Sequence, residues 1–166
     1  MSEFKSISRE AVPLALEKAE RYRLLNEPAQ AESVCLDVLA VDPQNQQALV
    51  MLLLALADQL RSGSPECFEE AQAVVPKLQE EYQRLYYSGL IWERRGQACA
   101  IEGHPGSNPV AYEWISQAMD YYERAERLRP PANDDPILRW NSCLRLCQRY
   151  HLHAEPEDIH EPVLGD

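Results

Sequence analysis

The stretch from residue 83 to residue 130 constrains the fold of this chain more than any other. Apolar residues recur at helical spacing in residues 85–92 and again in residues 118–125. Between these halves, residues 104–109 contain two prolines and a glycine, which break a helix and turn the chain back. The stretch therefore predicts an antiparallel pair of helices.

Small and large side chains alternate along this pair in a fixed pattern, formed by Leu85, Gly89 and Trp92 in the first helix and Ala118, Tyr122, Ala125 and Pro130 in the second. The pattern resembles the tetratricopeptide repeat (TPR), a helix-turn-helix unit with a period of about 34 residues. That repeat places roughly 12 positions between its first-helix small residue and its second-helix alanine, whereas Gly89 and Ala118 are 29 positions apart. We expect the surplus of about 17 residues to extend each helix by about two turns, to about 20 residues.

A shorter pair precedes this one. Helical spacing predicts helices from about Ser8 to Leu25 and from about Pro28 to Ala40, because Pro28 is tolerated in a first turn. The TPR markers recur here without an insertion, at Ala19, Tyr22, Ala31, Cys35, Val38 and Pro43. This is the clearest repeat in the chain.

The middle of the chain predicts a second pair. Residues from about Asn45 to Leu60 are apolar on nearly every side, which indicates a helix that is enclosed by its neighbours. A fourth helix is expected to begin with Ser64 as its cap and Pro65 in its first turn. Pro76 should shorten or kink that helix.

A seventh helix is expected after Pro130 and Pro131. Asn133 or Asp134 would cap it, and one side carries Ile137, Trp140, Leu144 and Cys147. A last helix of this kind covers the exposed apolar face at the end of a repeat stack. The predicted fold is all-α: a right-handed superhelical stack of about three antiparallel helix pairs plus a C-terminal capping helix, over residues 1–150. Residues 151–166 carry charge and prolines, which predicts a flexible acidic tail.

Composition narrows the functional classes. The net charge of −11 disfavours binding to nucleic acid, because an acidic chain repels the phosphate backbone. The N-terminus has no signal-peptide pattern, no apolar run is long enough to span a membrane, and the five cysteines are scattered. We therefore expect a cytoplasmic protein, of bacterial type, that does not bind membranes.

No catalytic signature is present, so we predict that the protein is not an enzyme and holds no cofactor and no metal. The loop at residues 103–107 lacks the lysine of a phosphate-binding loop. Cys143, Cys147 and His151 do share one helix stripe, and His153 could complete a four-ligand zinc site. A metal or small-molecule binder that uses this stripe, or a cavity between the longer helices, remains an alternative. A self-associating structural subunit, such as a homodimer, is another.

The TPR resemblance implies a concave groove lined by the first helix of each pair. The groove positions of this chain are Val50, Met51, Leu54, Tyr86, Tyr87, Leu90 and Arg94, with the acids Glu17, Glu20, Asp58 and Glu93 along the edge. Methionine and tyrosine suit a peptide-binding surface, since one adapts its shape and the other offers a large contact area. We expect a protein-protein interaction scaffold whose partner peptide is apolar and has basic flanks.

Overall fold

Helices make up nearly all of the regular structure. The computed structural model describes residues 2–61 and 63–156, and these contain no strand. The helices are α1 (Val12–Leu24), α2 (Pro28–Val41), α3 (Gln46–Leu60), α4 (Glu66–Val74), α5 (Glu81–Glu102), α6 (Ser107–Glu126) and α7 (Asp135–Tyr150), with short 3-10 turns at Arg9–Ala11 and Val75–Lys77. The predicted all-α class is confirmed.

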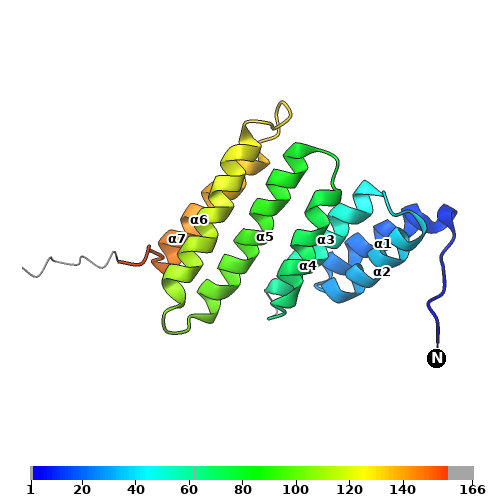
Figure 1. Cartoon of the computed structure of the whole chain (residues 1–166), viewed down its shortest axis with the longest axis horizontal. Coiled ribbons are helices and arrows are strands. Elements are labelled where there is room, and N and C mark those ends of the chain that lie inside the picture. The colour runs from blue at the N-terminus through cyan, green and yellow to red at the C-terminus, as the bar shows by residue number, and fades with distance from the viewer. Residues whose placement is uncertain (1, 62, 157–166) are drawn as a thin grey trace, which may run out of the picture.

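Successive helices pack against each other, and the pairs follow one another along the longest axis of the molecule (Figure 1). A second set of contacts joins α1 to α3, α3 to α5 and α5 to α7. The first helices of the pairs therefore form one continuous row. Helix α7 lies against both α6 and α5, which is the position predicted for a capping helix.

Local sequence explains where the helices begin and end. Asn45 caps α3, because its Oδ1 accepts a hydrogen bond of 2.9 Å from the Ala48 N–H. Pro76 lies in the 3-10 turn that ends α4, so the predicted shortening is confirmed. The predicted Ser64 cap is wrong: the N-cap of α4 is Pro65, which makes no side-chain capping hydrogen bond.

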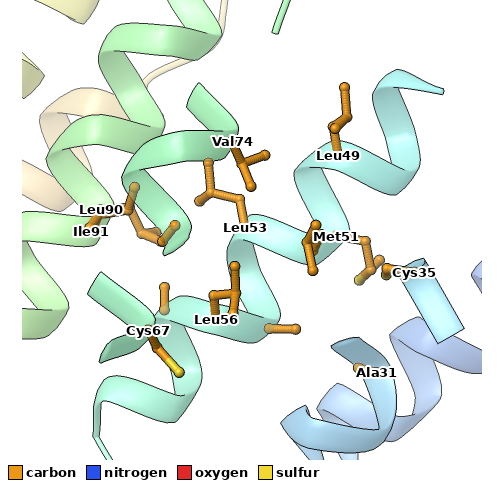
Figure 2. Packing of buried hydrophobic residues seen from close by; sticks show 14 of the residues in the cluster. Ala31, Cys35, Leu49, Met51, Leu53, Leu56, Cys67, Val74, Leu90 and Ile91 are labelled. Atoms are coloured by element: carbon orange, nitrogen blue, oxygen red, sulfur yellow. The ribbon is translucent and has the colours of Figure 1, made fainter. Parts of the chain in front are cut away.

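The largest core cluster surrounds α3. Figure 2 shows Leu49, Leu53 and Leu56 of this helix between Cys35 of α2 and residues of α4 and α5. Leu53 is fully buried, and most of α3 is buried on every side. This confirms that neighbours enclose the apolar helix, as its composition predicts.

The α5–α6 pair has the predicted extra length, since the two helices contain 22 and 20 residues. Two glycines allow the helices to approach closely. A Cβ added to Gly89 would lie 2.8 Å from Cε1 of Tyr122, and one added to Gly96 would lie 2.6 Å from Cδ1 of Ile115. A side chain at either glycine would therefore push the helices apart.

Packing continues past the predicted domain boundary at residue 150. Leu152 packs against the cluster formed by α6 and α7. Asn108, at the start of α6, donates from Nδ2 to the His151 carbonyl at 3.1 Å and accepts from the His153 N–H at 3.1 Å. These contacts tie residues 151–153 to α6. Most of the predicted flexible tail, residues 157–166, lies outside the described residues.

Candidate functional site

The predicted groove residues lie on α3 and α5, two neighbours in the row of first helices. Val50, Leu54 and Tyr87 are half-buried and pack against the large core cluster. Each therefore keeps part of its apolar surface in contact with solvent. We call Val50, Leu54, Tyr87 and Arg94 the inner surface.

Two of the predicted groove residues belong to the core instead. Met51 is 8% exposed and Leu90 is 2% exposed, and both are members of the large cluster. The reason is geometric: neighbours enclose α3 on nearly all sides, and Leu90 faces them from α5. The predicted continuous exposed strip is therefore wrong, and the accessible apolar surface is smaller.

Tyr86 has a structural role on α5. Its ring stacks with Tyr82 at 5.9 Å and packs edge-on against Tyr87 at 5.2 Å, measured between ring centroids. Burial raises the pKa of its hydroxyl, and the nearby Arg139 of α7 partly offsets that rise. Burial raises the pKa of Tyr87 to about 12, so that its phenol is neutral at physiological pH. The two tyrosines therefore present apolar rings and uncharged hydroxyls.

Arg94 is the charged member of the inner surface. Burial lowers its pKa, while the carboxylates of Glu93 and Asp58 raise it and Arg139 and Arg61 lower it. Nη1 donates to Oε1 of Gln97 at 3.3 Å. Its buried Nε has no hydrogen-bond partner within the described part of the chain. Because this nitrogen is buried, it is an unpaired donor that a ligand at the surface does not reach.

The four acids predicted for the groove edge lie in three different environments. Glu17 and Glu20 are exposed on α1, as an edge requires. Asp58 is neutralised by Arg23, with Nε and Nη2 at 2.9 and 2.8 Å from Oδ2. Glu93 is only 5% exposed, so its assignment to the edge is wrong. Of the four predicted edge acids, Glu17 and Glu20 are therefore the two whose charge is exposed.

Glu93 instead lies at the centre of a buried polar cluster that joins α5, α6 and α7. The Tyr122 hydroxyl donates to Oε2 of Glu93 at 2.5 Å, and Nη1 of Arg139 donates to Oε1 at 3.2 Å. Burial disfavours the charge of Arg139, but the Glu93 carboxylate together with Tyr86 and Tyr122 more than compensates and raises its pKa. Burial, and then the charge of Glu93, raise the pKa of Tyr122, which remains a donor.

A polar hollow of about 390 Å³ adjoins the inner surface where α1, α3 and α5 end. Its lining residues are Arg23, Asn26, Asp58, Arg61 and Ile101. Two arginines face one aspartate here, and Arg94 is close enough to interact electrostatically with Asp58 and Arg61. This end of the surface is therefore positive, in contrast to the expected negative edge.

The cysteine-histidine stripe does not come together as a ligand set. Cys143 is 1% exposed among Tyr122, Ile115 and Ala118, and burial raises its pKa, which keeps the thiol protonated. His151 is the exposed C-cap of α7, in a left-handed backbone conformation. Among the described residues, no group of three or more His, Cys, Asp or Glu side chains could hold a metal ion.

Comparison with family models, with characterised proteins and with solved structures finds no significant match to this chain. No helix in the described part combines the length and the apolar character that crossing a membrane requires. Arguments about function therefore depend on the geometry of the chain itself.

Proposed function

We propose that this chain is a non-enzymatic adaptor of the TPR type that binds an apolar segment of a partner protein across its inner surface. The finer parts of the proposal are a right-handed superhelical stack and a location in the cytoplasm. The chain would act by bringing its partner to other proteins, without any chemical step.

One observation carries the proposal. Val50, Leu54 and Tyr87 lie on the neighbouring helices α3 and α5, pack against the large core cluster, and are only half-buried, so that they retain apolar surface in contact with solvent. A partner that covers these three side chains would remove that surface from water, which stabilises a complex by roughly 25 cal/mol for each Å² buried. Tyrosine and arginine are also enriched where binding energy concentrates, and Tyr87 and Arg94 lie on the same helix.

The charges beside the inner surface define the partner further. Glu17 and Glu20 on α1 favour a basic residue in the partner segment. Arg61 and Arg94 favour an acidic residue near the polar hollow. The expected segment thus has an apolar middle, a basic flank and an acidic residue that lies near the polar hollow.

Selection from a random peptide display library tests this proposal. The protein is immobilised, and enriched peptides are sequenced after washing at about 150 mM salt, where surface charges are screened over about 8 Å. We expect enriched peptides to share two or more apolar residues next to a lysine or arginine. Enrichment of uniformly acidic or purely polar peptides, or no enrichment at all, would contradict the proposal.

Self-association is a second candidate, because one apolar hollow lies on the first helix pair. It has a volume of about 230 Å³ and is lined by Ile7, Ala11, Leu14, Ala15, Lys18, Val34 and Asp37. Leu14 is 57% exposed over it. Sedimentation of the free protein, carried out before any peptide is added, distinguishes a dimer from a monomer.

A further inference from the structure

A third hollow, away from the inner surface, lies where α5 and α6 extend beside the short helix α4. It has a volume of about 310 Å³, and its lining residues are Leu60, Gly63, Pro65, Arg95, Ala98, Cys99, Glu102 and Trp114. Most of these side chains are apolar. Helix α4 has 9 residues and α5 has 22, so α4 cannot cover the full length of its neighbour. The added turns of α5 and α6 therefore create this hollow.

Arg95 is fixed inside the hollow by aromatic rings. Its guanidinium carbon lies 3.9 Å from the ring centroid of Phe68 and 4.1 Å from that of Trp114. Stacking of this kind holds the planar group in one orientation and covers its faces, while the N–H donors point outward along its edge. In the described part of the chain, Arg95 makes these ring contacts but no hydrogen bond or ion pair. Its donors are therefore preorganised and unused.

We infer that this hollow binds a small ligand that combines an apolar body with one carboxylate. The carboxylate accepts two parallel hydrogen bonds from the edge of Arg95, a geometry that the planar guanidinium favours. The apolar body lies against Trp114, Leu60 and Ala98. Few polar groups in a mostly apolar wall are typical of pockets for small molecules, and this volume is near the lower end of their range.

Two neighbouring groups determine which anion fits. Glu102 lines the hollow, is more than half exposed, and lies 3.8 Å from His104. Its negative charge disfavours a doubly charged phosphate more than a singly charged carboxylate, and among the described residues no second cation lines the hollow. Cys99 donates through Sγ to the Ser107 carbonyl at 3.6 Å, and burial raises the pKa of its thiol. The Cys99 thiol is therefore mostly protonated and contributes to the apolar wall of the hollow.

Calorimetric titration with matched probes tests the inference. Phenylbutyrate supplies both the apolar body and the carboxylate, phenylbutyramide has the same body without charge, and inorganic phosphate has charge without the body. We expect saturable binding of phenylbutyrate, at least about tenfold weaker binding of the amide, and no binding of phosphate. Equal affinity for acid and amide, or no saturable binding of the acid, would overturn the inference.

Variants identify the residues responsible. Arg95→Gln should weaken phenylbutyrate binding by at least about tenfold, whereas Arg145→Gln, on an exposed position of α7, should leave it unchanged. Glu102→Gln should tighten binding by about two- to threefold, because it removes a repulsive charge from the rim. The Glu102 variant does not alter the stacked core, so it remains informative if Arg95→Gln fails to fold. Weaker binding by Glu102→Gln would contradict a carboxylate ligand.

Thiol labelling detects binding without relying on the heat that calorimetry measures. In a Cys147→Ser background, Cys99 is the remaining half-exposed cysteine among the described residues, since Cys35, Cys67 and Cys143 are buried. Bound phenylbutyrate should slow maleimide labelling of Cys99 by about tenfold at saturation, and phenylbutyramide at the same concentration should not. Labelling that is unaffected by phenylbutyrate would place the ligand elsewhere and overturn the assignment.

Discussion

Replacing Glu93 by alanine is expected to lower the free energy of unfolding by about 3 kcal/mol or more, because a buried ion pair would lose one partner. The change leaves the Tyr122 hydroxyl, on a side chain with 0% exposure, without its acceptor. It also leaves the half-buried Arg139 without its carboxylate. Unfolding by urea, followed by circular dichroism, measures the loss.

Three companion variants make the Glu93 result interpretable. Glu93→Gln should lower the free energy of unfolding by less than Glu93→Ala does, since an amide oxygen can still accept a hydrogen bond from Tyr122. Adding Tyr122→Phe to Glu93→Ala should recover part of the loss, because it removes the unpaired donor. Glu126→Ala, which breaks a more exposed pair with Arg129, should change stability by less than about 1 kcal/mol. If Glu93→Ala were no more destabilising than Glu126→Ala, the buried cluster would not hold α7 in place.

Replacing Gly96 by valine is expected to destabilise the protein by about 2 to 3 kcal/mol, because overpacking at a close helix contact forces the backbones apart. Even the Cβ alone would lie 2.6 Å from Cδ1 and 3.2 Å from the backbone nitrogen of Ile115. The side chain of Ile115 can rotate away, but its backbone cannot. The same urea unfolding measures this effect.

The control for Gly96→Val is Gln72→Val, at an exposed position of α4. It reports the cost of a β-branched residue in a helix, which is about 0.5 kcal/mol. Combining Gly96→Val with Ile115→Ala should restore part of the stability, because the shortened side chain makes room for the new one. A double variant that is less stable than the sum of its two changes predicts would argue against close contact at this point.

Helix positions and the extra length of the α5–α6 pair could be predicted from sequence, because they depend on short-range signals. Asn45, Pro28 and Pro76 mark helix ends by rules that act within a few residues. The surplus residues between Gly89 and Ala118 extend the two helices by added turns, and both helices have the expected lengths. The predicted Ser64 cap was wrong because a serine before a helix shows only that a capping hydrogen bond is possible, and does not show that it forms.

The groove was harder to predict, because a helix face does not reveal how deeply its neighbours cover it. Met51 and Leu90 fit a peptide-binding face by composition but are buried by adjacent helices. Glu93 is buried in the same way, although a glutamate is usually exposed to solvent. A signal was present: Glu93 lies one helical turn after Gly89, on the face of α5 that meets Tyr122. Its partner Arg139 could not be inferred, since the docking of α7 is a long-range contact.

The most direct test of the adaptor proposal is calorimetric titration of the best display-selected peptide against two leucine-to-lysine variants. Leu54→Lys alters the inner surface, and Leu36→Lys alters an exposed position on α2, outside that surface. Both variants are first compared with the unmodified protein by thermal unfolding, so that only folded protein is titrated. We predict that Leu54→Lys weakens binding by at least about thirtyfold, or about 2 kcal/mol, and that Leu36→Lys leaves it unchanged. Undiminished binding by folded Leu54→Lys, or an equal loss in Leu36→Lys, would contradict the proposal that the inner surface holds the partner.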